Sequence, residues 1–495
     1  MTQKNRLKGG LINRNNTRKF EFNGQSMQGF EGDTLASALL ANDIRLVGRS
    51  FKYHRPRGML SAGSEEPNAL VELRTGNRKE PNSRATTTEL YDGLVANPQN
   101  CWPSLNFDFL GVNDLLAPFL TAGFYYKTFM WPSVFWEKVY EPVIRRAAGL
   151  GSASLEPDPD CYDKGFLHAD LLIIGAGPSG LLAALTAAKS GVRVIIVDED
   201  FVTGGRLNAE NYILDEQPGS IWAKGITDEL SDFDNVKVLT RTTVIGAFDH
   251  GIYGAVERVS DHLKTPVSGK PRQILWRIYT KQAILCSGAT ERSIVFENND
   301  RPGIMLAGAI RNYVNRWAVT PSQNVAIFTN NNDGHQTARA LLNKGVNVVA
   351  VIDTRNQKVK SPDYETFSDF KTRVVKIEDT NYNLKYDDLI YANDTRVKTL
   401  QLRYWNEIDD FITEEIKKKD IKHSNAQNLS ALKLTFLKKL LHEIKTNKLS
   451  VMPDSLPQNK ADPYNERQTV DVDVDVEYKD PNKKEKNKKS RYGSW

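Results

Sequence analysis

Cysteine is scarce in this chain: of its 495 residues only Cys101, Cys161 and Cys286 are cysteines. They lie far apart, so they form neither a Cys-x-x-Cys pair nor the spacing of a zinc site. They also do not indicate the disulfide framework of a small secreted domain. We therefore expect no metal site and a reduced, cytoplasmic compartment.

The sequence also has no long uninterrupted hydrophobic run. Its most apolar stretch, residues 109–135, is broken by Asn113, Asp114, Pro118, Lys127 and Pro132, which excludes a membrane-spanning helix there. Residues 1–18 are basic and polar without an apolar centre, so we expect no signal peptide.

A strong excess of one charge is missing as well. The chain has 66 lysines and arginines against 61 aspartates and glutamates, a formal net charge of +5. This balance does not favour nucleic-acid binding. With 40% hydrophobic and 26% charged residues, the composition is typical of a globular protein, and its length predicts two to four domains.

The most informative motif that is present is a glycine-rich turn after an apolar run. Residues 171–174 read Leu-Leu-Ile-Ile, as in a parallel strand buried on both faces. Gly175 permits a tight turn, Gly177 permits backbone to approach a pyrophosphate, and Gly180 permits a helix to pack closely on the strand. We interpret this turn, Gly175-Ala176-Gly177-Pro178-Ser179-Gly180, as a dinucleotide site.

The residues after the turn complete the motif. Residues 181–190 are expected to form a helix whose N-terminus faces the phosphates. A second apolar run, residues 194–197, ends in Asp198 and Glu199, either of which is placed to accept a hydrogen bond from a ribose hydroxyl. The alternative interpretation is a plain strand–helix–strand unit without a ligand.

Composition changes along the chain predict five segments. We expect a flexible basic arm at residues 1–18, a β-rich domain at 19–108, an aromatic-rich connecting segment at 109–168, a dinucleotide-binding α/β domain at 169–355, and a lysine-rich helical segment with a disordered tail at 356–495. In the β-rich domain, Asn23-Gly24 predicts a hairpin and residues 33–42 a helix capped by Asp33 or Thr34. Further strands are expected at residues 236–239, 274–279 and 283–286.

A second strand–helix–strand unit is expected at residues 324–353. Its strands are residues 324–329 and 346–352, with a helix at 336–344 between them. The intervening turn, Asn330-Asn331-Asn332-Asp333-Gly334, lacks the glycine pattern, so a nucleotide-facing turn and a structural crossover both stay open. His335 is given no catalytic role. The sequence has no Ser/His/Asp set or paired carboxylates that would name a catalytic residue.

Several long strings resemble the α subunit of heterotetrameric sarcosine oxidase over roughly residues 10–355. They are residues 32–40 (GDTLASALL), 49–58 (RSFKYHRPRG), 122–129 (AGFYYKTF), 288–292 (GATER) and 299–305 (NDRPGIM). The resemblance implies a Rossmann-like, two-dinucleotide-binding-domain flavoprotein fold preceded by a ferredoxin-like (β-grasp) domain. A plant-type [2Fe–2S] cluster needs thiolates in a Cys-x₄-Cys-x₂-Cys pattern, and the corresponding loop, residues 49–63, has no cysteine. We therefore expect a domain without an iron–sulfur cluster.

The resemblance also implies chemistry, cofactors and partners. The family oxidatively demethylates sarcosine to glycine, with oxygen giving hydrogen peroxide, and passes the one-carbon unit to tetrahydrofolate. The α subunit is expected to hold NAD, with FAD as the alternative, and to share an FMN with an FAD-containing β subunit; γ and δ subunits are further partners. Carried over to this chain, Gly204, Gly205 and Arg206 lie against the dinucleotide, and Ser287, Gly288 and Ala289 form the second cofactor-side turn.

One basic cluster and the C-terminal region leave alternatives open. Lys52, His54 and Arg55 face either an FMN phosphate or, as the favoured interpretation, solvent or another subunit. After Arg355 the sequence does not resemble the family, so we expect no counterpart of the family's C-terminal folate-binding domain in residues 356–495. The rival functions are therefore the α subunit of a related amine, proline or opine dehydrogenase, and a non-catalytic nucleotide-binding scaffold or inactive fragment.

Overall fold

The computed structural model describes residues 3–115, 131–149, 151–296, 298–353 and 366–367. The strands are β1 (Asn13–Phe22), β2 (Gln25–Glu31), β3 (Gly48–Arg49), β4 (Pro56–Arg57), β5 (Leu70–Leu73), β6 (Glu80–Arg84), β7 (Leu94–Pro98), β8 (Tyr162–Ile174), β9 (Val194–Val197), β10 (Ile213–Leu214), β11 (Gln217–Pro218), β12 (Val236–Leu239), β13 (Thr242–Phe248), β14 (Ile252–Arg258), β15 (Gln273–Leu285), β16 (Asn324–Thr329), β17 (Asn347–Asp353) and β18 (Thr366–Phe367). The α-helices are α1 (Leu35–Ala41), α3 (Glu141–Ala148), α4 (Pro178–Lys189), α5 (Gly219–Ser231), α6 (Ala307–Asn315) and α7 (Asn332–Leu342). Short helical turns are η1 (Gly76–Arg78), η2 (Phe109–Asp114), η3 (Trp136–Tyr140), η4 (Gly205–Asn208) and η5 (Asp249–Gly251).

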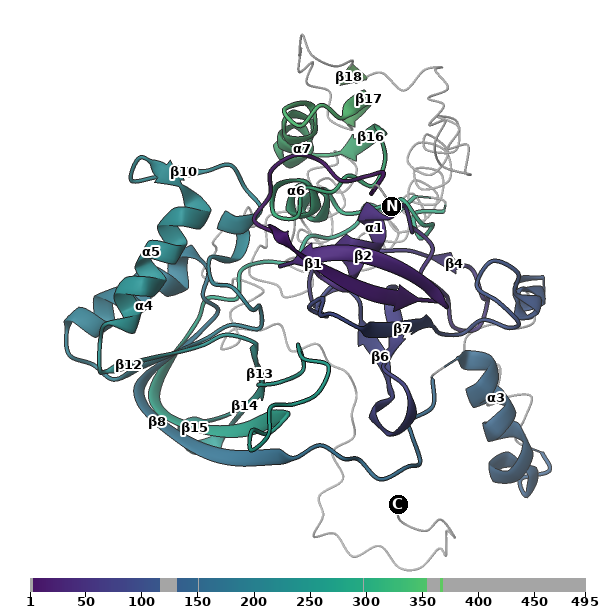
Figure 1. Ribbon diagram of the computed structural model, residues 1–495, viewed down its shortest axis with the longest axis horizontal. Coiled ribbons are helices and arrows are strands. Elements are labelled where there is room, and N and C mark those ends of the chain that lie inside the picture. The colour runs from purple at the N-terminus through teal and green to yellow at the C-terminus, as the bar shows by residue number, and fades with distance from the viewer. Residues whose placement is uncertain (1–2, 116–130, 150, 297, 354–365, 368–495) are drawn as a thin grey trace, which may run out of the picture. The chain divides into compact units, whose positions relative to one another are not determined.

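The N-terminal domain is a five-stranded mixed sheet with helix α1 packed on it (Figure 1). Its strand order is β2-β1-β7-β5-β6, in which β1 and β7 are parallel and the other pairs are antiparallel. This arrangement is the ferredoxin-like fold that the sequence predicts. Its helix also begins as expected, since Thr34 caps α1 by accepting a hydrogen bond from the Ser37 amide.

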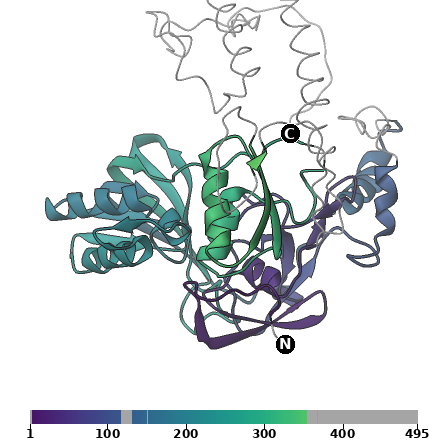
Figure 2. The same ribbon diagram turned by 90° about the horizontal axis from the view of Figure 1, so that it is seen from above.

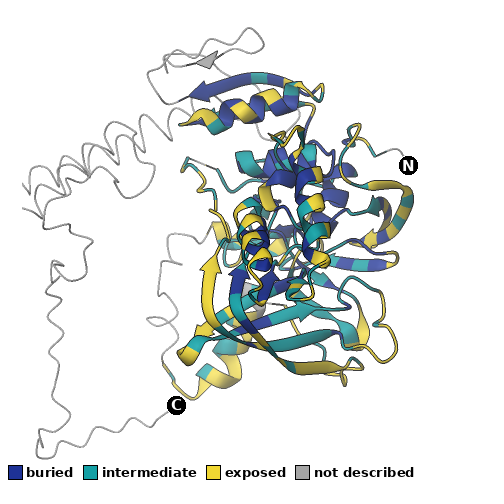
Figure 3. Ribbon diagram, turned by 90° about the vertical axis from the view of Figure 1, so that its left-hand side faces the viewer, coloured by how far each residue is buried: buried dark blue, intermediate teal, exposed yellow. Residues whose placement is uncertain are grey.

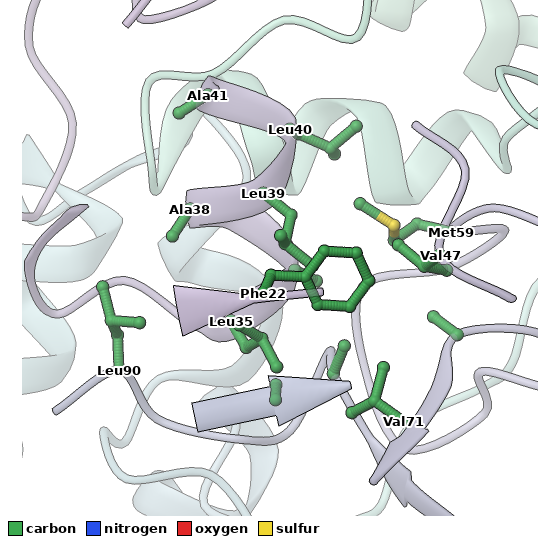
Figure 4. Packing of buried hydrophobic residues seen from close by; sticks show 14 of the residues in the cluster. Phe22, Leu35, Ala38, Leu39, Leu40, Ala41, Val47, Met59, Val71 and Leu90 are labelled. Carbon is green, nitrogen blue, oxygen red and sulfur yellow. The ribbon is translucent and has the colours of Figure 1, made fainter. Parts of the chain in front are cut away.

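The hairpin and the core of this domain follow from local sequence. Asn23 and Gly24 both have positive φ, which a two-residue hairpin turn requires. Every residue of α1 is buried. Its Leu35 and Leu39 lie with Phe22 of β1 and Val71 of β5 in one apolar cluster (Figure 4).

The expectation of a flexible arm at residues 1–18 is wrong. Strand β1 begins at Asn13, and Asn5 is buried. Arg6 forms an ion pair with the buried Asp33 at 2.7 Å and also donates to the Trp317 carbonyl. Such contacts over long sequence separations are what the local basic composition does not reveal.

The central α/β sheet has the strand order β12-β9-β8-β15-β14-β13. Strands β12, β9, β8 and β15 are parallel, and β14 and β13 add an antiparallel meander. Two predicted boundaries are wrong here. The sheet begins at Tyr162 rather than at Ala169, and the two strands expected at residues 274–279 and 283–286 are one continuous strand, β15.

Strand β8 ends between two apolar layers, as its unbroken apolar run predicts. Ile173 faces a cluster that includes Leu181 of α4 and Trp222 of α5. Leu172 faces a second cluster with Ile195 of β9. This two-sided burial fixes the carboxyl end of β8, where the glycine turn begins.

The second strand–helix–strand unit is confirmed. Strand β16 is parallel to β17, and α7 packs on both, as Figure 2 shows from above. Helix α7 begins at Asn332, four residues before the predicted start, because Asn331 caps it. Along α4 and α7 buried residues recur among exposed ones, and Figure 3 colours these classes on the ribbon.

The connecting segment is only partly helical in the parts that the structure describes: η2, η3 and α3 lie between residues 109 and 148, whereas its residues from Tyr162 onward belong to strand β8. Residues 116–130 lie outside the described residues, as does the C-terminal segment after Asp353 except for β18. Among the described residues, no helix is both long and apolar enough to cross a bilayer.

Candidate functional site

The glycine turn joins β8 to α4 with very little space around two of its glycines. Gly175 has a φ of +104°, and a Cβ on it would lie 2.5 Å from the Cys286 carbonyl oxygen. A Cβ on Gly180 would overlap the carbonyl oxygen of Gly175. Gly175 therefore requires glycine for its left-handed turn and its close approach to Cys286, and Gly180 requires glycine for the close approach of α4 to the turn, in keeping with the tight turn and the close packing that the sequence predicts.

The N-terminus of α4 is arranged to receive an anion. Gly177 is its N-cap and offers no side-chain oxygen, so no side-chain cap satisfies the first amides, and Pro178 is at the first helical position. A Cβ on Gly177 would meet no described atom within 4 Å. This open space beside uncapped amides, followed by Ser179, fits the pyrophosphate of a dinucleotide.

Asp198 lies at the end of β9, but the backbone already uses its carboxylate. One oxygen accepts a hydrogen bond from the Ala176 amide at 2.6 Å and the other from the Asp200 amide at 2.8 Å. Burial raises the pKa of Asp198 to about 6, and the charges of Asp200 and Glu199 act in the same direction, against the two amides. Asp198 therefore fixes the glycine turn to the β9 tip, whatever else it binds.

Glu199 is the more accessible of the two predicted ribose partners. Its side chain is exposed, and one carboxylate oxygen accepts a hydrogen bond from Ser64 Oγ at 2.6 Å. Its backbone carbonyl accepts from Arg258 at 2.5 Å. Glu199 thus contacts a loop of the N-terminal domain. The sequence did not indicate this contact.

The segment Gly204–Arg206, which the resemblance places against the dinucleotide, lies against the glycine turn in the structure. The Gly204 amide donates to the Ala176 carbonyl at 2.8 Å, and a Cβ on Gly205 would lie 3.1 Å from Gly177 Cα. Arg206 is 59% exposed and pairs with Glu210 at 2.7 Å. Its guanidinium is thus accessible to a ligand, although Glu210 is only 6% exposed and Asp333 lies 3.9 Å away as a second acidic partner.

A buried arginine that sequence reasoning missed links the two strand–helix–strand units. Arg311 of α6 is 1% exposed and contacts Glu210 at 2.9 Å, Asp333 at 2.8 Å and Thr337 at 2.6 Å. Because Glu210 also holds Arg206, the Gly204–Arg206 segment is connected to the first turn of α7. Asp333 is occupied in this way, which favours a structural role for the second turn.

The Ser287–Ala289 turn directly follows β15 and lies beside the glycine turn. The Ser287 amide nitrogen would be 3.0 Å from a Cβ on Gly175, and the side chains of Ser287 and Ala289 are exposed, as is Gly288. The structure therefore brings the predicted cofactor-binding residues to one edge of the sheet, at the carboxyl ends of β8, β9 and β15.

Of the predicted basic cluster at Lys52, His54 and Arg55, the prediction is wrong for His54, whereas Lys52 and Arg55 both lie over the ring of Tyr53. His54 is 1% exposed, and its Nδ1 lies 2.7 Å from the buried Asp108 carboxylate. Arg55 points to Asp114 at 3.0 Å. His335 is likewise buried, with Nε2 2.9 Å from Asp353 Oδ2, in keeping with the structural role expected for it.

The described residues do not fit an iron–sulfur cluster. The only cysteine among residues 16–101 is Cys101, and within the described ranges no group of three or more histidine, cysteine or acidic side chains could hold a metal ion. The thiols of Cys101, Cys161 and Cys286 are all free.

Comparisons with known proteins agree with this layout. Residues 16–101 match the family described as "2Fe-2S iron-sulfur cluster binding domain", and residues 170–252 match "FAD dependent oxidoreductase". The alpha subunit of sarcosine oxidase from Rhizobium meliloti is 57% identical over 348 residues, which are 70% of this chain and 35% of the relative. The chain is a homologue of the alpha subunit of sarcosine oxidase.

Other relatives of the sarcosine oxidase type extend the similarity. The alpha subunit of sarcosine oxidase from Corynebacterium sp. (strain U-96) is 37% identical over 70% of this chain and 31% of the relative. An opine oxidase subunit of Agrobacterium tumefaciens is 29% identical over 37% of each chain. The chain thus spans about a third of the length of the sarcosine oxidase subunits it matches. Among solved structures, L-proline dehydrogenase from P. horikoshii has a TM-score of 0.48 at 19% identity, covering 73% of this chain and 57% of that one.

Proposed function

We propose that this chain is the dinucleotide-binding part of an amine oxidoreductase that acts on CH–NH donors, working as an α-type subunit. The observation that supports it most is the uncapped α4 N-terminus beside Gly177, in a chain 57% identical to the alpha subunit of a sarcosine oxidase. The proposed reaction is oxidative demethylation of sarcosine. With water, the N-methyl group leaves as formaldehyde and glycine is formed, while two electrons and two protons pass to oxygen and give hydrogen peroxide.

In this proposal each residue of the site has a distinct task. The α4 amides and Gly177 receive the pyrophosphate, with Pro178 and Ser179 in the first turn of the helix. Glu199 binds a ribose hydroxyl, and Asp198 fixes the turn. Arg206 leaves Glu210 to pair with a phosphate oxygen, since guanidinium groups suit that geometry. A bound nicotinamide or flavin supplies the electron-accepting ring, which this chain only orients.

We propose NAD as the resident dinucleotide, with FAD as the alternative. The resemblance to the α subunit favours NAD, whereas the description of the family matched by residues 170–252 favours a flavin. Asp198 and Glu199 suit the ribose of either molecule. FMN, a β subunit that contains FAD, and γ and δ subunits complete the proposed assembly.

A second candidate is a related enzyme for another secondary amine. The similarity to an opine oxidase subunit supports it. In both cases we expect the substrate pocket to lie mainly on a partner subunit. A nucleotide-binding scaffold without turnover is the remaining possibility.

Release of the bound nucleotide tests the proposal. The purified chain is denatured, and the supernatant is identified by absorbance and mass. NAD without flavin supports an α-type subunit, and FAD alone supports the flavin alternative. A folded chain that releases neither and gains no sarcosine-dependent oxygen consumption with a β subunit contradicts the enzyme proposal and favours the scaffold.

A further inference from the structure

The loop from Leu60 to Ala69 is built around one buried carboxylate. Glu66 is 1% exposed. One of its oxygens accepts hydrogen bonds from the amides of Leu60 at 2.9 Å and Ser61 at 2.6 Å, and from Ser61 Oγ at 3.2 Å. The other accepts from the amides of Asn68 at 2.8 Å and Ala69 at 3.1 Å. Four backbone amides therefore point at one anion inside the domain.

The spacing of the loop matches that of an iron–sulfur loop. Plant-type [2Fe–2S] sites carry three ligands as Cys-x₄-Cys-x₂-Cys, with a fourth further along the chain. Ser61, Glu66 and Ala69 stand at this same spacing, within the residues matched to "2Fe-2S iron-sulfur cluster binding domain". All three are buried, none being more than 1% exposed. The spacing is that of the three cluster cysteines, but none of the three positions is a cysteine in this chain.

A fourth position comes to the loop from a neighbouring segment. The Ala85 amide donates to the Ala69 carbonyl at 2.9 Å. The next residue, Thr86, is 2% exposed, and its hydroxyl donates to the Gly63 carbonyl at 2.7 Å. Thr86 therefore stands where a fourth ligand from downstream in the chain is required.

We infer that Glu66 takes the place of an iron–sulfur cluster as the centre that organises this loop. A cluster is an anionic group whose sulfurs accept backbone hydrogen bonds. A carboxylate is also anionic and accepts about four hydrogen bonds, here all supplied by the loop. The N-terminal domain is thus ordered by its own side chain and does not carry electrons.

The ordered loop has neighbours that explain why it is kept. The Leu306 amide, just before α6, donates to the Leu60 carbonyl at 2.8 Å, and the buried Tyr313 hydroxyl donates to the Ser61 carbonyl at 3.0 Å. Ser64 donates to Glu199 at 2.6 Å. Glu66 therefore positions the loop that contacts the α6 region and Glu199, which follows β9.

Hydrogen exchange of the full chain tests the role of the carboxylate. In Glu66→Ala, the amides of Leu60, Ser61, Asn68 and Ala69 should exchange at least about tenfold faster, while amides in β8 and β9 keep their protection. In Glu66→Gln one oxygen remains, so only one of the two amide pairs should accelerate. Glu65→Ala is the matched control, because Glu65 is exposed. Unchanged protection of the four amides in Glu66→Ala overturns the inference.

Reconstitution of an iron–sulfur cluster tests whether Ser61, Glu66, Ala69 and Thr86 stand at cluster-ligand positions. The wild-type chain, incubated anaerobically with ferrous iron and sulfide, should bind no cluster. The variant with Ser61→Cys, Glu66→Cys, Ala69→Cys and Thr86→Cys should take up about two irons and two sulfides per chain. A control carrying Glu65→Cys in place of Glu66→Cys shifts the pattern by one residue and should bind far less. A wild-type chain that takes up a cluster, or a folded four-cysteine variant that binds no more iron than the control, overturns the inference. If that variant does not fold, the exchange experiment decides alone.

Discussion

The loop at residues 60–69 and the glycine turn at residues 175–180 both direct backbone amides toward a point, but only one of these points is filled. In the first loop Glu66 supplies the anion from the chain itself. In the second turn the space beside Gly177 is open and α4 has no side-chain cap. In our proposal, the anion site built with its own carboxylate is a structural centre, whereas the open one is a place for a ligand.

Removing the internal anion should have the largest effect on stability. Glu66→Ala leaves four amides without their acceptor, two of them on the buried residues Ser61 and Ala69, and the loss of a buried acceptor typically costs about 1–3 kcal/mol before relaxation. We expect the free energy of unfolding to fall by about 3 kcal/mol or more. Chemical denaturation, with Glu65→Ala as the control, measures this change. A loss of less than about 0.5 kcal/mol for Glu66→Ala would contradict the role of Glu66 as the structural centre of its loop.

Gly180→Val should damage the open turn through packing rather than through ligand loss. A Cβ on Gly180 overlaps the Gly175 carbonyl, so α4 must move away from β8. Overpacking of this kind costs about 1–3 kcal/mol, and nucleotide retention should fall with it. Denaturation and nucleotide content are measured together; a stable variant that retains full nucleotide contradicts the close packing.

Gly177→Val should separate binding from folding. The Cβ at this position meets nothing within 4 Å, so we expect stability to change by less than about 1 kcal/mol. The new side chain occupies the proposed place of the pyrophosphate, and the purified chain should lose its nucleotide. A variant that keeps full nucleotide occupancy would contradict the assignment of this turn as the pyrophosphate site. Gly225→Val, at an exposed position of α5 where a Cβ also meets nothing within 4 Å, controls for added bulk at a glycine.

How well each region could be predicted depends on how local its determinants are. The turn at Gly175 was predictable because strand, glycines and helix are contiguous in sequence. Glu66 was not, because the four amide partners of its carboxylate are visible only in the fold. Arg311 was missed for the same reason: its partner Glu210 is 101 residues away. The Ser61-x₄-Glu66-x₂-Ala69 spacing was the signal that could have found the filled site.

The pH dependence of stability should show that the buried Asp198 carboxylate beside the glycine turn is destabilised in its charged form. Burial raises the pKa of Asp198 to about 6, above the value near 3.9 of an unfolded chain. Between these values the folded state holds more protons, so this group lowers the free energy of unfolding as pH rises from about 4 to about 6, with no further change above. Asp198→Asn should flatten that part of the profile. An unaltered slope would show that Asp198 does not titrate in this window.

The smallest expected effect is that of Arg206→Ala, and it distinguishes a ligand contact from an internal ion pair. Arg206 is 59% exposed and bonded to Glu210, which is 6% exposed, with Asp333 at 3.9 Å. Because solvent screens the exposed cation, we expect the pair to contribute about 0–1 kcal/mol. Glu210 keeps Arg311 as a partner in the variant, so stability should hardly change. If Arg206 turns to a phosphate oxygen, nucleotide affinity should fall roughly tenfold, and more steeply at low salt, since one charge-assisted hydrogen bond is lost. Lys189→Ala, which removes a similarly exposed cation paired with Glu229, is the matched control. Equal affinity for both variants would leave Arg206 as a structural partner of Glu210 and confine the anion site to the α4 amides.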